Sequence, residues 1–183
     1  VIISPYSPDY VVGGYFVDIA FEQTGRASLV VNLLYLDLLG WDAYGLLAYA
    51  GHPGDSWDVA EPIDCHSDMF GPYASLAFSS DDRPLIGFFS ETVPAVAELR
   101  NGDWSFESVD KPAPIYDYGF PSELILDSLG QPLVAYPVGS EGVVRLAWRQ
   151  SGYWYHQNVS VPGSIVGYVS LGLNAVSYTH LRA

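Results

Sequence analysis

The chain is poor in cationic side chains. It has seven lysine and arginine residues in 183, and Lys111 is the single lysine. Its 21 aspartate and glutamate residues therefore leave a net charge of −14 at pH 7. Binding to a nucleic-acid backbone needs clustered lysine and arginine, because these residues neutralise the phosphates. The composition thus argues against nucleic acid as a partner.

Cysteine and long apolar runs are also scarce. Cys65 is the single cysteine, so no disulfide can form within the chain. We interpret it as a small apolar side chain, because a reactive thiol usually has a cationic neighbour. No apolar run reaches the roughly 18 residues of a membrane-spanning helix. The longest candidate is interrupted by Asp37, Gly40 and Asp42, so we expect no membrane span.

Aromatic and turn-forming residues, by contrast, are abundant. The chain has 14 tyrosines, eight phenylalanines and five tryptophans, which pack well on the pleated surface of a sheet. Its 18 glycines and 13 prolines are spread along the sequence as turn signals. With 49% apolar and 15% charged residues, the composition is that of a folded chain. These features predict an all-β fold. Low lysine, high tyrosine and acidity favour an exported bacterial protein, extracellular or on the cell surface.

A sequence pattern of about 48 residues occurs three times and begins a fourth time. The step from Leu76 to Leu124 is 48 residues, and the step from Leu124 to Leu171 is 47. Each copy opens with a short apolar segment and the first three close with a tryptophan, at Trp57, Trp104 and Trp154. The first copy has ten extra residues between about 33 and 49. Regular spacing with one variable loop predicts a repeat fold, with the tryptophans packed between units.

Each copy divides into four short strands. In the second copy, alternation and turn signals predict strands at 75–78, 85–90, 95–100 and 104–109, with an Asn-Gly hairpin at 101–102. The third copy predicts strands at 123–126, 132–137, 143–149 and 154–159. Four antiparallel strands in about 48 residues are typical of one blade of a β-propeller.

We therefore expect a β-propeller fragment of about three four-stranded antiparallel blades and the start of a fourth. Propellers close with about 4 to 8 blades, so we expect the remaining blades to belong to a longer chain. Residues 176–183, VSYTHLRA, resemble adapter read-through at the end of metagenomic gene sequences, and we treat them as an artefact. The single partial domain, 1–183, divides into the tail of a preceding blade (1–10), a blade with an insertion (11–64), two further blades (71–110 and 119–160) and the start of the next (163–175).

The repeat resembles propeller repeats in secreted and surface proteins of bacteria, related in layout to those of sialidases. The resemblance rests on the leading glycine, Leu-x-Leu/Phe, a turn ending in Gly/Asp-x-Pro, then Gly-x-Trp and Val-Asp, over residues 11–173. It implies the fold and no particular activity. The sialidase box Ser-x-Asp-x-Gly-x-x-Trp is missing, and Arg100, Arg145 and Arg149 fit no arginine triad on the predicted strands. Arg26 and Arg83 share a turn position and are expected to act in the turn and at the strand edge rather than in substrate recognition.

The insertion in the first copy is the candidate binding site. It places Trp41, Asp42 and Tyr44 around a glycine turn, where aromatic rings and a carboxylate would suit a sugar. The alternative is an elongated hairpin whose aromatic residues pack on the neighbouring blade.

The acidic stretch 55–68 could hold calcium, but its spacing matches no calcium loop, and we favour a solvated strand and linker. We therefore expect no metal, no cofactor and no catalytic residue. The favoured function is a non-catalytic binding module of a larger exported bacterial protein that presents loops to a glycan or protein partner. The alternatives are a fragment of a propeller-type glycosidase or polysaccharide lyase, and a structural spacer.

Overall fold

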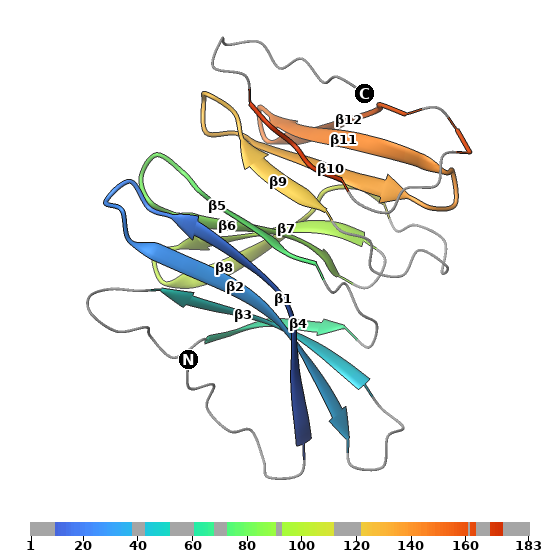
Figure 1. Ribbon diagram of the computed structural model, residues 1–183. Helices are drawn as coiled ribbons and strands as arrows, with labels where there is room; N and C mark the ends of the chain where they lie inside the picture. Colours follow the sequence, from blue (N-terminus) through green and yellow to red (C-terminus); the bar gives the residue numbers. More distant parts are fainter. Residues whose placement is uncertain are drawn as a thin grey trace.

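In the part of the chain that the structure describes, twelve strands form three separate antiparallel sheets (Figure 1). The computed structural model describes residues 10–37, 43–51, 61–67, 73–90, 93–111, 122–160, 162–163 and 169–173. Each sheet is a four-stranded meander, in the order β1-β2-β3-β4, β5-β6-β7-β8 and β9-β10-β11-β12. The prediction of an all-β chain with four-stranded antiparallel units is confirmed. Within the described ranges there is no helix that could cross a membrane.

The strand bounds follow the repeat. The first sheet contains β1 (Tyr10–Phe21), β2 (Ala27–Asp37), β3 (Ala43–Gly51) and β4 (Glu61–Ser67). The second contains β5 (Ser75–Phe78), β6 (Pro84–Ser90), β7 (Val93–Arg100) and β8 (Asp103–Ser108). The third contains β9 (Glu123–Leu126), β10 (Pro132–Val138), β11 (Val143–Gln150) and β12 (Tyr153–Asn158). Most of the ten extra residues of the first copy fall between the start of β2 and the end of β3, so they lengthen this hairpin.

The turn between the first two strands has one geometry in all three sheets. In the third sheet, Asp127 donates its N–H to the carbonyl of Gln131, and Gly130 donates back to Asp127. The position of Gly130 has a φ of 73°, and its equivalents Gly25 and Asp82 have φ values of 83° and 57°. Glycine adopts this left-handed conformation without strain, and aspartate is among the few other residues that tolerate it.

The second sheet lies between the other two and packs against both (Figure 1). Trp104 packs at the interface with the first sheet, where its ring meets Tyr49 edge to face at 5.5 Å. Trp154, on β12 of the third sheet, packs at the interface between the second and third sheets. The predicted structural role of these two tryptophans is confirmed, whereas Trp57 lies outside the described residues. Buried residues of the first interface include Val30, Leu47, Leu76, Ile86, Phe88, Ala95 and Ala97. Those of the second include Leu85, Phe89, Val96, Val109, Leu124, Val134, Tyr136, Val138, Val143 and Ala147.

A side chain on the first strand of one sheet bonds to the backbone of the next. The Oδ2 atom of Asp18 accepts the N–H of Leu76 at 2.7 Å, and Oγ of Ser75 accepts the N–H of Leu124 at 2.7 Å. Asp18 and Ser75 occupy the same repeat position, and we call this bond from a side chain to the next sheet the joint. The joint occurs twice, so β1, β5 and β9 lie in succession. Glu123 holds this position in the third sheet. Burial, and then the negative charge of Asp18, raise the pKa of Glu123.

Candidate functional site

The residues proposed from the insertion are not tested by the structure. Trp41 and Asp42 lie outside the described residues. Tyr44 lies on β3 opposite Tyr35 of β2, but its side chain is not among those described. Much of the acidic stretch 55–68 also falls outside the described ranges, so calcium binding there stays a prediction. In the part of the chain that is described, no cluster of three or more His, Cys, Asp or Glu residues could hold a metal ion.

A groove of about 690 Å³ lies between the second and third sheets. It opens where the β5–β6 and β9–β10 turns meet the β7–β8 and β11–β12 hairpins, so all its walls come from one end of the strands. The lining residues are Ser79, Arg83, Leu85, Glu98, Arg100, Asp127, Leu129, Gly130, Gln131, Pro132, Trp148, Arg149, Gln150, Ser151 and Gly152.

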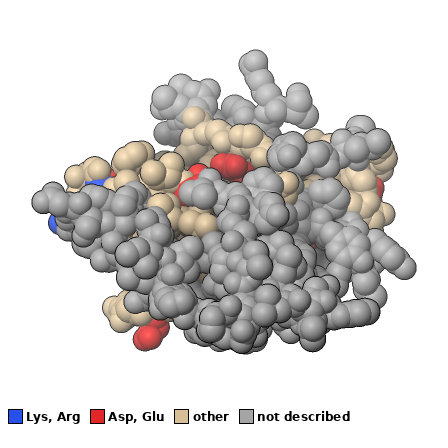
Figure 2. Space-filling model, turned by 60° about the horizontal axis from the view of Figure 1, so that its bottom comes forward, with Lys and Arg blue, Asp and Glu red and all other residues tan. Residues whose placement is uncertain are grey.

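Three arginines from three different segments line this groove. Arg83 ends the β5–β6 turn, Arg100 ends β7, and Arg149 lies near the end of β11. They are three of the seven cationic residues of the chain. On the face in Figure 2, blue atoms of Lys and Arg are visible at one margin, whereas red atoms of Asp and Glu occur at several places. Arg83 thus lines the groove in addition to ending its turn.

Glu98 holds two of these arginines in place. Its side chain lies on the face of β7 that packs toward the third sheet, opposite Leu85, and the residue is 7% exposed. Arg83 donates from Nη1 to one carboxylate oxygen, and Arg100 donates from Nη2 to the other at 2.7 Å. The hydrogen bond to Glu98 raises the pKa of Arg100. A buried carboxylate needs such partners, so the three side chains form a fixed unit.

The outer ion pairs of the groove are more open to solvent. Arg83 donates from Nε to Oδ2 of Asp81 at 2.7 Å. The hydroxyl of Ser79 donates to Oδ1 of Asp81 at 2.6 Å, and this bond, followed by that from Arg83, lowers the pKa of Asp81. Arg149 lies 3.3 Å from Oε2 of Glu107. The side chains of Asp81 and Glu107 are 60% and 38% exposed, so these two pairs contribute little to stability.

The third sheet supplies the opposite wall through its first turn. Oδ1 of Asp127 accepts the N–H groups of Leu129 and Gln131, each at 2.8 Å, and so fixes the turn. Leu129 at the tip is 81% exposed, an apolar side chain at the mouth of a polar groove. The site therefore combines guanidinium donors, carboxylate and amide groups, and apolar surface.

The corresponding end of the first interface is bridged. Gln23 donates its backbone N–H to Oδ1 of Asp82 at 2.7 Å and its Nε2 to the carbonyl of Ser80 at 2.8 Å. Ser80 and Gly130 occupy the positions of Gln23 and Asp82 one unit later. Serine is too short to span the gap in the same way, and glycine has no side chain to accept a bond.

The opposite end of the second interface carries a second polar cluster, centred on Asp110. Its Oδ2 accepts the hydroxyl of Tyr136 at 2.8 Å and Nη1 of Arg145 at 2.6 Å. Nε2 of His156 lies 4.0 Å from Oδ1. Burial alone would raise the pKa of Asp110, but the hydrogen bonds from Tyr136 and Arg145 help to lower it. Burial and the bond to Asp110 raise the pKa of Tyr136. This cluster joins the two sheets.

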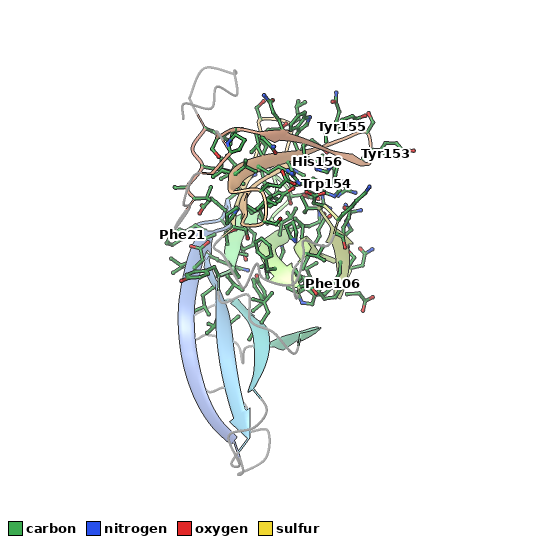
Figure 3. The ribbon with its side chains drawn as sticks, turned by 90° about the vertical axis from the view of Figure 1, so that its right-hand side faces the viewer. Phe21, Phe106, Tyr153, Trp154, Tyr155 and His156 are labelled. Atoms are coloured by element: carbon green, nitrogen blue, oxygen red, sulfur yellow. The ribbon has the colours of Figure 1, made fainter. Side chains whose placement is uncertain are left out.

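Exposed aromatic residues lie on the outer strand of the third sheet (Figure 3). Tyr153 is 71% exposed, and the ring of Tyr155 stacks on Trp148 with centroids 6.1 Å apart. The strand register places these rings on the face turned away from the second sheet, opposite to Arg149 and Trp154. Tyr153 and Tyr155 are not among the residues that line the arginine groove, whereas Trp148 is.

Sequence reasoning missed the groove because its residues are far apart along the chain. The repeat alignment held a usable signal. Arg83 lies in the turn before its predicted strand, and Arg100 and Arg149 end theirs, so all three lie at the same end of the predicted blades. What the alignment could not give was the packing of one sheet on the next, which brings these ends together.

No protein-family model matches the sequence, and no curated protein matches it significantly. Among solved structures, a fucose lectin from Kordia zhangzhouensis, determined in complex with methyl-fucoside, is similar with a TM-score of 0.49 and 12% identity. The match covers 78% of this chain and 97% of the lectin chain. Similarity at this level assigns neither a family nor a function to this chain.

Proposed function

We propose that this chain is a non-catalytic module that binds a glycan in the groove between its second and third sheets. The observation that carries the proposal is the joint presence of Arg83, Glu98, Arg100 and Arg149 around one cavity of about 690 Å³. This volume falls within the roughly 300 to 1,000 Å³ typical of small-molecule sites.

The chemistry of the groove suits sugar hydroxyl groups. Each hydroxyl both donates and accepts a hydrogen bond, and the groove offers guanidinium donors beside carboxylate and amide acceptors. Bonds to charged groups are stronger than those between neutral groups. Apolar side chains such as Leu129 and Pro132 can contact the carbon atoms of the sugar ring.

We further propose that the three sheets are consecutive blades of a propeller in a larger exported protein. Four-stranded meanders in succession, with their first strands adjacent and one joint repeated, support this arrangement. The acidic, lysine-poor composition supports export. A propeller places functional residues between blades and on their connecting loops, which is where the groove lies.

The glycosidase or lyase alternative has less support from the groove. Glycoside hydrolysis uses two carboxyl groups, about 5 to 9.5 Å apart, that can exchange protons with the substrate or attack it. Both oxygens of Glu98 are engaged by arginines, and Asp127 accepts two N–H groups of its own turn. These two carboxylates therefore hold the arginines and the turn that form the groove.

A glycan array probed with the 183-residue chain tests the proposal. We expect a set of glycans to bind, and Arg149→Gln to weaken that binding by about tenfold or more, as expected for loss of a charged hydrogen bond. Arg26→Gln is the matched control, because Arg26 holds the turn position of Arg83 in the first unit but lies outside the groove.

A companion variant separates the groove from the insertion. If Trp41→Ala or Tyr44→Ala abolishes binding while Arg149→Gln does not, the binding site lies in the insertion. If no glycan binds to a chain shown to be folded by its melting curve, glycan recognition is wrong.

A further inference from the structure

We propose that the groove selects glycans carrying an anionic substituent, a carboxylate or a sulfate ester. This inference rests on the proposed function and names the ligand class of the same site. Arg149 and the outer edge of Arg83 receive the anionic group, while Glu98 stays buried beneath it.

The first argument is the balance of hydrogen-bonding groups. A guanidinium group has five N–H donors. Bonds to Glu98 and Asp81 engage two donors of Arg83, and the contacts of Arg100 and Arg149 with carboxylates engage one each. Both oxygens of Glu98 are already occupied. The three arginines therefore keep N–H donors that these carboxylates do not engage, and a ligand rich in acceptor oxygens complements them.

The second argument is the ease with which the outer carboxylates can be replaced. Asp81 and Glu107 face solvent, and exposed ion pairs of this kind are worth about 0 to 1 kcal/mol. The 3.3 Å separation between Arg149 and Glu107 is also longer than a strong charged hydrogen bond. An anionic group on a sugar can therefore take the place of Glu107 at small cost. The bonds of Arg83 and Arg100 to the buried carboxylate of Glu98 stay intact during this exchange.

The third argument distinguishes an anionic sugar from a free anion. Leu85, Leu129 and Pro132 add apolar surface to the groove, and Leu129 is largely exposed at its mouth. A bare sulfate ion leaves this surface in water, whereas the carbon face of a pyranose ring covers part of it.

A matched pair of ligands provides the test. Methyl β-glucoside and methyl β-glucuronoside differ only at C6, where a hydroxymethyl group is replaced by a carboxylate. We expect the glucuronoside to bind at least about tenfold more tightly in calorimetry, and its advantage to shrink as salt is added. Methyl glucoside 6-sulfate is the second arm, and inorganic sulfate at equal concentration is expected not to displace either sugar.

Two variants move the preference in opposite directions. Arg149→Gln is expected to weaken binding of the glucuronoside much more than binding of the glucoside, and so to remove most of the preference. Glu107→Gln frees Arg149 and is expected to increase the affinity for the glucuronoside severalfold, a gain that a merely misfolded variant cannot show. Arg26→Gln is expected to change neither affinity.

The outcomes separate this inference from the proposed function. Equal affinities for glucoside and glucuronoside overturn the anionic preference and leave glycan binding standing. Displacement of the sugars by inorganic sulfate at equal concentration shows a simple anion site and also overturns it. Absence of binding by every glycan on the array removes both proposals.

Discussion

The two interfaces between sheets differ most at the end where the first turns meet. At the first interface, Gln23 spans the gap and bonds to Asp82 and to the backbone of Ser80. At the second, the same positions hold Ser80 and Gly130, and the gap is a groove lined by three arginines. The same backbone arrangement is therefore bridged at the first interface and open as a groove at the second. The side chains at the positions of Gln23 and Asp82 decide which of the two forms.

The interfaces also differ in how closely the sheets approach. Val30 of the first sheet and Gly87 of the second occupy one repeat position, and both are buried facing the next sheet. A Cβ atom added at Gly87 would lie 2.8 Å from Cβ of Leu124 and 3.1 Å from Oγ of Ser75. The second interface is therefore tighter near the first strands and open at the turns, where the ligand is proposed to bind.

The largest effect is expected from Asp110→Ala, which removes the polar tie of the second interface. Arg145 would keep a largely buried charge without this partner, and the hydroxyl of Tyr136 would lose its acceptor. Removing one member of such a buried pair costs about 3 kcal/mol. Urea denaturation of the variant and the parent protein would measure this loss in the free energy of unfolding. The control is Glu141→Gln, which removes the more exposed partner of Arg145 and should cost at most about 1 kcal/mol. Equal losses in the two variants would show that Asp110 has no special role.

The next effect is expected from Gly87→Ala. The added methyl group cannot fit between Leu124 and Ser75 without separating the sheets, and overpacking of this kind costs about 1 to 3 kcal/mol. Thermal unfolding should show a lower melting temperature. Gly172→Ala is the control, because no atom lies within 4 Å of the added Cβ and stability should not change. A stable Gly87→Ala variant would mean that the second interface tolerates a wider spacing.

The double variant Ser80→Gln/Gly130→Asp tests whether the groove is open for lack of a bridge. It copies the first interface onto the second, and aspartate tolerates the positive φ of this position, as Asp82 does. We expect glycan affinity to fall by about tenfold, with a change in stability below about 1 kcal/mol. Gly130→Asp alone should have a smaller effect on affinity. Unchanged binding by the double variant would place the ligand elsewhere.

The smallest effect is expected at Glu123, whose pKa shifts in the direction opposite to that of Asp110. The lowered pKa of Asp110 means that its contribution is present above its usual pKa of about 3.9 and is lost as the pH falls through its folded-state value. Glu123 has a raised pKa, so its charge destabilises the fold at neutral pH and protonation relieves this.

Glu123→Gln should therefore stabilise the protein at pH 7 by less than about 1 kcal/mol, and the gain should vanish in acid. Melting curves recorded between about pH 3 and pH 8, a range that roughly spans the titration of Asp110 and Glu123, would measure this gain in stability. Asp18→Asn relieves the same repulsion but weakens the acceptor for Leu76, so it should not stabilise. A gain that persists in acid would assign the effect to something other than charge.

The strands could be predicted from sequence because their signals are local. The turn at Asn101-Gly102, the proline at Pro84 and the alternation along β7 and β11 depend on residues within one unit. The structural role of Trp104 and Trp154 followed from their repetition alone.

The groove could not be predicted, because it depends on which faces meet. Glu98 and Trp148 occupy the same repeat position and both face the unit that follows, so Glu98 meets the third sheet while Trp148 packs in the cluster that includes Val169 and Leu171. Repetition placed Arg26 and Arg83 at the same turn position and predicted a role in the turn and at the strand edge for both. Only the partner of Arg83 on a neighbouring strand, Glu98, distinguishes the two, and no spacing rule identifies that partner.

The bonds from Asp18 to Leu76 and from Ser75 to Leu124 have a consequence for how such a chain can lengthen. The second unit carries both halves of the joint, since Ser75 is the acceptor for the third unit and the N–H of Leu76 is the donor to the first. A duplicated gene segment therefore encodes a sheet that already fits its neighbours. Since aspartate and serine both serve as the acceptor, the joint also tolerates mutation. The turns beside it can therefore diverge, into a bridge as at the first interface or an open groove as at the second.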